Sequence, residues 1–241
     1  MAKGIDRLRA HLAEIVVFTA VLLLLSAGTY SRNRLWNDEI ALMKDCLEKS
    51  SNKPRVHLNL GSAYLQAGDY GKALGAIKRA IEIDSDYAEA YYNLSIASQK
   101  MGDLDQAIAM ARKSLELDPK LYTAYYTLGT IYFEKGQYAE AEGAFKAFVK
   151  VLPYFPEAHH LLAVVYAARK EFVKAVAEFE WELRINPYHI LSHLNLGQIL
   201  WFEMGNRKKA IYHLKVALML DPLLPNRAEI RRLVRALERT S

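Results

Sequence analysis

A unit of 34 residues recurs five times between residues 54 and 223, and this repeat constrains the fold more than any other feature of the 241-residue chain. The units begin at residues 54, 88, 122, 156 and 190, and the last carries one extra residue near Gly205. Every unit has leucine at its seventh position and a small residue at its eighth: Gly61, Ser95, Gly129, Ala163 and Gly197. One unit of this length cannot bury its apolar face alone, so neighbouring units are predicted to stack into a solenoid.

The spacing within each unit predicts two helices that pack closely together. A second small position recurs in every unit: Ala73, Ala107, Ala141, Ala175 and Ala210. Proline follows the second predicted helix of four units, where it stops a helix: Pro119, Pro153, Pro187 and Pro222. Twelve glycines and seven prolines in the whole chain are too few for a loop-rich all-β fold. We therefore predict an all-α protein.

The repeated segments, such as HLNLGSAYLQAGDY and YYTLGTIYFEKGQY, resemble the tetratricopeptide repeat family. The resemblance covers residues 54–223 and implies a right-handed superhelical solenoid whose first helices line a concave groove. It divides the chain into five helix pairs: 54–87, 88–121, 122–155, 156–189 and 190–223. The chain departs from the family pattern at Ser85, where proline is usual, and at Phe148 and Glu182, where a small residue is usual.

Both ends of the repeat array are predicted to carry a capping helix. Residues 31–53 contain an amphipathic stripe that would pack on the first unit: Trp36, Ile40, Met43 and Leu47. Residues 224–241 place an apolar stripe at helical spacing, with most of the arginines elsewhere: Ile230, Leu233, Val234 and Leu237. The basic outer face of this second helix either solvates the last repeat or attracts anionic lipid or an acidic partner.

Residues 12–30 predict a transmembrane helix, which follows a short basic tail formed by residues 1–11. The segment carries one charge, Glu14, and at about 1.5 Å per residue it can just span a hydrocarbon core of about 30 Å. The alternative is a signal peptide cleaved after Gly28. We expect an uncleaved anchor, because Glu14 and the long approach to the apolar run are atypical of signal peptides. Basic residues flank both ends equally, so charge alone does not set the orientation.

The net charge of +5 lies entirely at the two ends of the chain, because residues 54–223 contain 19 basic and 19 acidic residues. Binding along a phosphate backbone needs a local excess of basic residues, so no nucleic-acid partner is expected. The single cysteine, Cys46, excludes an internal disulfide and a cysteine-based zinc site.

The chain contains no HExxH, Walker, GxSxG or GxGxxG motif, so we predict that it is not an enzyme and needs no cofactor. Its histidine pairs, His159 with His160 and His189 with His193, would suit a metal ion by spacing alone. However, His57, His159 and His193 share the fourth position of their repeats, where the other two units have tyrosine. They are therefore interpreted as packing residues, and no metal site is predicted.

Candidate partner-binding residues come from the positions that face the groove in this family. The sixth position supplies Asn59, Asn93 and Asn195, which resemble the asparagine ladder that grips peptides in O-linked N-acetylglucosamine transferase. An amide donates and accepts hydrogen bonds at once, so it suits a peptide backbone. The fifth and twelfth positions are aromatic or apolar in nearly every unit, and they add five aromatic candidates: Tyr92, Tyr126, Phe133, His160 and Trp201. Because no lysine occupies the fifth position, a carboxylate clamp is disfavoured, and we expect a hydrophobic, helical or extended peptide segment.

Residues 29–61 resemble the segment that follows the last membrane helix of bacterial O-mannosyltransferase-like glycosyltransferases with C-terminal tetratricopeptide repeats. This resemblance implies extracytoplasmic repeats, in the periplasm or on the outer face of the cytoplasmic membrane. The function expected first is a membrane-anchored scaffold that binds partner proteins or peptides and supports assembly or stability of an envelope complex. Two alternatives stay open: an accessory subunit that presents peptides to an envelope glycosylation or export machine, and a structural or self-associating subunit of a larger membrane complex.

Overall fold

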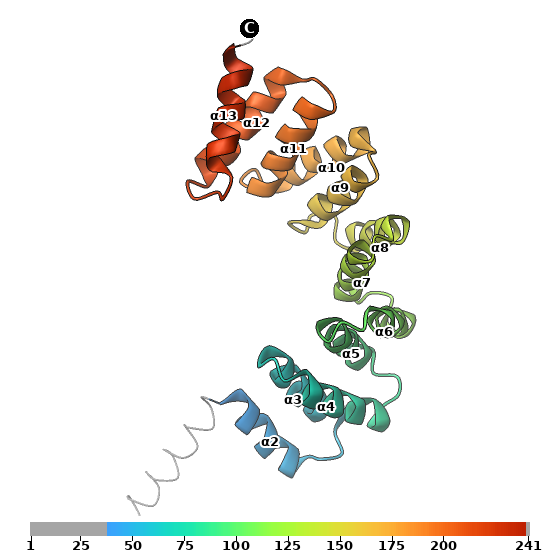
Figure 1. Ribbon diagram of the computed structural model, residues 1–241. Coiled ribbons are helices and arrows are strands. Elements are labelled where there is room, and N and C mark those ends of the chain that lie inside the picture. The colour runs from blue at the N-terminus through green and yellow to red at the C-terminus, as the bar shows by residue number, and fades with distance from the viewer. Residues whose placement is uncertain (1–37, 240–241) are drawn as a thin grey trace, which may run out of the picture. The chain divides into compact units, whose positions relative to one another are not determined.

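The computed structural model describes residues 38–239, which form twelve α-helices joined by short turns and contain no strand (Figure 1). The all-α prediction is confirmed for these residues. The predicted transmembrane helix, residues 12–30, lies outside the described part of the chain. Among the helices of residues 38–239, none combines the length and the apolar character that a bilayer crossing requires.

The chain divides into two compact units, one ending at Ser85 and the other beginning at Asp86. The first unit contains α2 (Glu39–Lys49), α3 (Pro54–Gln66) and α4 (Tyr70–Ile83). The second unit contains four helix pairs and a final helix: α5 (Ala88–Lys100), α6 (Leu104–Leu117), α7 (Tyr122–Glu134), α8 (Tyr138–Val151), α9 (Ala158–Ala168), α10 (Phe172–Ile185), α11 (Ile190–Phe202), α12 (Arg207–Leu220) and α13 (Arg227–Arg239). Within the second unit, each helix packs mainly against the next one in the sequence, as a stacked array requires.

The turn inside each helix pair follows from a repeated local sequence. A residue with positive φ ends the first helix at Gly68, Gly102, Gly136, Lys170 and Gly205. Glycine suits four of these positions because it lacks the Cβ that disfavours the left-handed region. In three pairs the next residue caps the second helix: the side chains of Asp69, Asp103 and Asn206 accept hydrogen bonds from backbone N–H groups three residues later. The extra residue of the fifth unit, near Gly205, therefore lies within a turn.

The small eighth position allows the two helices of a pair to approach closely. A Cβ atom added to Gly129 would lie 2.6 Å from Cε1 of Phe145, which is itself almost fully buried on α8. Gly61 and Gly197 meet Ile77 and Leu214 in the same way, at 2.6 and 2.8 Å. The prediction that these positions mark close helix contacts is therefore confirmed.

The histidines at the fourth position of three repeats are buried packing residues, as the sequence predicts. The ring Nε2 atoms of His57, His159 and His193 lie 2.7, 3.1 and 3.0 Å from backbone carbonyl oxygens six residues earlier in the chain. Each ring therefore ties the start of its helix to the preceding turn. Within residues 38–239, no group of three or more His, Cys, Asp or Glu side chains is arranged to hold a metal ion.

Helices flank the repeats at both ends of the described chain. In the first unit, α2 packs on α3, and Ile40, Met43 and Leu47 are half-buried. In the second unit, α13 packs on α12 through an apolar face: Ile230, Val234 and Leu237. The opposite face of α13 is basic and exposed: Arg231, Arg232, Arg235 and Arg239. Trp36, the first member of the predicted N-terminal stripe, lies outside the described residues.

Candidate partner-binding site

A hollow lined by aromatic rings opens in the second unit, and we call it the aromatic pocket. Its volume is about 230 Å³, and α5, α7, α8 and the turn before α9 contribute its lining: Tyr92, Tyr122, Thr123, Tyr126, Phe148, Phe155 and Glu157. Of the residues that the sequence places in the groove, Tyr92 and Tyr126 come together here. The pocket is large enough for one side chain of a partner but too small for a helix, whose diameter is about 10 Å.

The rings of the pocket hold one another in place. Tyr122 and Tyr126 lie one helical turn apart on α7, so both point to the same side of that helix. Phe148 packs against Tyr126 and Phe155, with ring centroids 5.8 and 5.4 Å apart and both pairs close to edge-on. Aromatic pairs prefer this geometry because the positive ring edge meets the negative ring face. Phe148 is 1% exposed, so it forms a fixed wall.

Two of the departures from the family pattern, Phe148 and Glu182, affect this pocket. The 27th position of the repeat holds a small residue in the first two units, Ala80 and Ser114, but Phe148 in the third and Glu182 in the fourth. Phe148 supplies the buried wall. Glu182 is fully buried, and its Oε1 accepts a hydrogen bond of 3.0 Å from the backbone N–H of Glu157. That bond holds the turn from which Glu157 and Phe155 reach the pocket.

A second hollow, of about 320 Å³, is lined by residues of α7, α9, α10 and α11. Phe133 and Asn195, both predicted from the sequence, line it together with Val164, Phe179 and Gln198. Trp201 lies nearby in the sequence on α11, where it is half-buried and packs against the apolar core. Four of the seven predicted groove residues of the second unit therefore line one of the two hollows, whereas the other three line neither: Asn93, His160 and Trp201.

His160 differs from the sequence interpretation, which places it on the groove surface. The structure buries it, with 9% of its surface exposed, and its Nδ1 lies 2.9 Å from Oγ of Ser192. Its ring also contacts His189 at a centroid distance of 4.7 Å. Burial, with a smaller contribution from His189, lowers the pKa of His160 to about 4, so the ring is neutral at pH 7. His160 therefore joins two repeats internally and lines neither hollow.

The predicted asparagine ladder is also divided. Asn59 is exposed on α3 in the first unit, whereas Asn93 and Asn195 are half-buried on α5 and α11 in the second. The sequence reasoning missed Tyr122, Phe155 and Glu157, which line the aromatic pocket. The unusual Phe148 could have indicated them, because a large ring at a position that normally holds a small residue must displace its neighbours or gather them around it.

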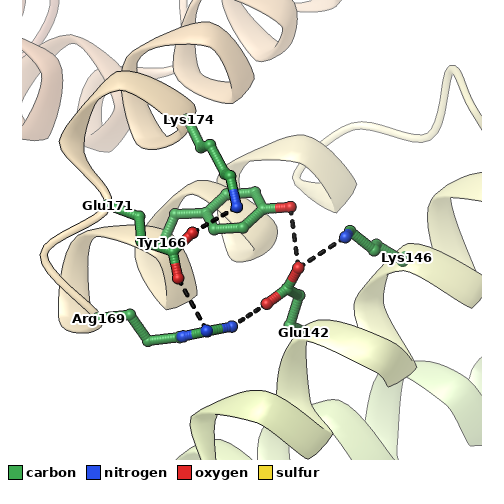
Figure 2. A network of polar contacts seen from close by, with 6 residues as sticks. All are labelled: Glu142, Lys146, Tyr166, Arg169, Glu171 and Lys174. Atoms are coloured by element: carbon green, nitrogen blue, oxygen red, sulfur yellow. Dashed lines mark hydrogen bonds and ion pairs between the residues drawn. The ribbon is translucent and has the colours of Figure 1, made fainter.

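A network of polar contacts joins the third and fourth repeats away from the aromatic pocket (Figure 2). Glu142 on α8 accepts hydrogen bonds from Nζ of Lys146 at 2.6 Å and from the hydroxyl of Tyr166 at 3.2 Å, and it also pairs with Arg169. Arg169 in turn contacts Glu171 at 2.9 Å. The hydrogen bond from Lys146 is the main reason that the pKa of Glu142 is lowered. Every charge in this network has a partner, so it is a structural joint between repeats.

Models of the tetratricopeptide repeat match residues 54–120, 98–151 and 126–190, which together make up more than half of the chain. This chain belongs to the tetratricopeptide repeat family. The match begins at Pro54, the first residue of α3, and extends over most of the repeats that the sequence pattern predicts.

Solved structures of tetratricopeptide repeat proteins are similar to this one. The crystal structure of MamA has 25% sequence identity and a TM-score of 0.63, and the alignment covers 67% of this chain and 94% of MamA. YrrB, described as having an unusual peptide-binding site, has 20% identity and a TM-score of 0.67, with 79% and 97% covered. PilF of Pseudomonas aeruginosa has 22% identity and a TM-score of 0.62, with 76% and 88% covered. A comparison with curated protein sequences finds no match.

Proposed function

We propose that this tetratricopeptide repeat protein is a membrane-anchored scaffold that binds a partner protein or peptide through the aromatic pocket. The fold and its structural neighbours indicate a scaffold for protein–protein interaction, and repeats of this family are typically not enzymes. The observation that carries the proposal is the gathering of aromatic rings at one accessible hollow of the second unit.

The exposed rings around the pocket are the chemical support for partner binding. Tyr122, Tyr126 and Phe155 are 39%, 37% and 41% exposed, although each is large and apolar. Single exposed apolar residues are ordinary, but several around one hollow are typical of an interaction surface. Aromatic residues are also the commonest anchors of protein interfaces, because each buries a large area with few rotatable bonds. A partner side chain that enters the pocket would cover these rings.

The anchor is the second part of the proposal, and it rests on residues 12–30 of the sequence. Their length and apolar composition suit a single membrane crossing. The resemblance of residues 29–61 to membrane glycosyltransferases supports an extracytoplasmic position for the repeats. Such an anchor would confine the aromatic pocket to the membrane surface, where partners belonging to a membrane complex are concentrated. Sedimentation of the full-length chain with alkali-washed membranes, and its release when residues 12–30 are deleted, would test this part.

Partner binding is tested by crosslinking the full-length protein in its native membranes and identifying the captured proteins by mass spectrometry. A variant with Tyr92→Ala and Tyr126→Ala should lose the specific partners, because both substitutions remove walls of the aromatic pocket. The matched control carries Tyr188→Ala and Tyr212→Ala, which remove tyrosines that are 74% and 61% exposed and do not line the pocket. If both variants capture the same partners as the wild type, the aromatic pocket is not the binding site.

A peptide-presenting role is the second candidate function, and the hollow of Phe133 and Asn195 favours it. There an aromatic ring adjoins the amide groups of Asn195 and Gln198, a combination that suits an extended peptide. The same crosslinking experiment separates the two roles. A defined set of membrane subunits supports the scaffold, whereas many unrelated envelope peptides together with a multi-span enzyme support peptide presentation.

A further inference from the structure

The aromatic pocket has a more specific chemical character than an apolar hollow. Five of its seven lining residues are aromatic, and only one, Glu157, carries a charge. We infer that the pocket takes the cationic end of a lysine or arginine side chain that the partner presents. This inference rests on the proposed function and specifies which chemical group of the partner contacts the pocket.

The arrangement of the rings suits a cation. The plane of Phe148 is inclined by 64° to that of Tyr126 and by 69° to that of Phe155. Rings at such angles do not form a flat stack, and because several of them line the same pocket, more than one can contact a common occupant. Ammonium and guanidinium groups are attracted to the negative faces of aromatic rings within about 6 Å of the ring centre.

Glu157 supplies a negative charge that has no counter-charge in the described structure. Glu157 is an exposed member of the pocket lining, and within residues 38–239 its carboxylate makes neither a hydrogen bond nor an ion pair. No lysine or arginine lines the pocket. A basic side chain from a partner would therefore gain ring contacts and an ion pair in the same place, whereas an apolar side chain would gain only the ring contacts.

The backbone at Glu157 gives independent support, because it has a φ of 76°, in the left-handed region. Glycine or asparagine adopts this region with less strain than glutamate does. The bond from the Glu157 N–H to Glu182 holds the conformation, and the other oxygen of Glu182 is buried without a hydrogen-bond partner among the described residues. A glutamate held in a strained conformation at the edge of a pocket is consistent with a function for its side chain.

One feature of the site favours an anion instead. The pocket borders the first residues of α7, Tyr122 and Thr123, and a helix N-terminus attracts negative charge. That attraction corresponds to about half a unit charge spread over the first turn. Glu157 carries a full unit charge in the pocket lining, and no basic side chain assists the helix end. The charge of Glu157 therefore outweighs that of the helix N-terminus, and the pocket favours a cation over a carboxylate as its occupant.

The test uses small probes with the full-length chain, observed by nuclear magnetic resonance of the probe. The basic probes are N-acetyl-arginine amide and N-acetyl-lysine amide. N-acetyl-norleucine amide has a similar apolar stem without the charge, and N-acetyl-glutamate amide carries the opposite charge. We expect the basic probes to bind at least about fivefold more tightly than the norleucine probe. Glu157→Gln should remove most of this advantage, and added salt should reduce it.

Two variants show whether binding occurs in the aromatic pocket. Tyr126→Ala should abolish binding of every probe, whereas Tyr212→Ala, which alters an exposed tyrosine outside the pocket, should leave it unchanged. Far-ultraviolet circular dichroism of each variant checks that the helices are intact. Probe binding that Tyr126→Ala does not weaken would place the cation elsewhere and overturn the inference.

The remaining outcomes separate this inference from the proposed function. Equal binding of the norleucine and arginine probes, with no effect of Glu157→Gln, would overturn the inference but leave an apolar anchor pocket for the partner. Tighter binding of the glutamate probe would also overturn it and assign the site to the start of α7. If no probe binds the wild type, and the variant with Tyr92→Ala and Tyr126→Ala still captures its partners, both the inference and the proposed function fail.

Discussion

Replacing Gly129 by alanine should destabilise the protein, although alanine is the better helix former. An ideal Cβ at this position lies 2.6 to 2.8 Å from three ring atoms of Phe145. Carbon atoms prefer a separation of about 3.5–4.0 Å, so the ring must move by about 1 Å. Phe145 is 1% exposed and belongs to the main apolar core, so its neighbours oppose that movement.

The size of the effect follows from two opposing contributions. Overpacking a filled core costs about 1–3 kcal/mol. Replacing glycine by alanine in a helix contributes about 1 kcal/mol in the other direction. We therefore expect a net loss of up to about 2 kcal/mol in the free energy of unfolding. Gly143→Ala on α8 is the matched control, because nothing lies within 4 Å of its added Cβ, and it should stabilise the protein by up to about 1 kcal/mol.

Urea unfolding followed by far-ultraviolet circular dichroism measures both variants. Adding Phe145→Leu to Gly129→Ala makes room for the new methyl group, so the double variant should be more stable than the sum of the two single changes predicts, by about 1 kcal/mol. The reasoning fails if Gly129→Ala is as stable as Gly143→Ala. In that case the two helices of the third repeat would not approach as closely as the structure shows.

Three further predictions use the same unfolding measurement. Burial lowers the pKa of both His160 and His213 to about 4, below the unfolded value of about 6.5, so their contribution is complete above pH 6.5 and falls as the pH drops toward 4. The buried His160 should lower the free energy of unfolding by about 2 kcal/mol by pH 5, and the less buried His213 should lower it by less. A urea midpoint that is unchanged between pH 7 and pH 5 would contradict this. Glu157→Gly should raise the free energy of unfolding by about 1 kcal/mol, because glycine accepts a φ of 76° without strain; a loss of stability would show that the glutamate side chain supports the turn. Glu142→Gln should lower the free energy of unfolding by about 1–2 kcal/mol, because the charged partners of Glu142 remain. The control, Glu116→Gln in an exposed pair with Lys113, should change it by less than about 0.5 kcal/mol. Equal effects would show that the network of Figure 2 is not a joint.

The repeat architecture could be predicted from the sequence alone. The recurring leucines and small residues report on local geometry in every unit, and the turn prolines do so in four of the five. Gly129 illustrates this, because a residue without a side chain beside a helical leucine already indicates that another helix lies close. The fourth-position histidines are a second example, since their shared position in the repeat was enough to interpret them as packing residues. The predicted anchor, residues 12–30, depends on the sequence alone, because it lies outside the described residues.

Which of the predicted groove residues lie together depends on packing between the repeats. It brought Tyr92 and Tyr126 into one pocket with Phe155 and Glu157, and it buried His160. Periodicity could not predict this, because a repeat pattern indicates which helix face a residue occupies but not how individual side chains fill the space between helices. A single ring, that of Phe148, changes that packing. A pocket forms only when side chains from several repeats meet, so its composition depends on contacts between segments that are distant in the sequence.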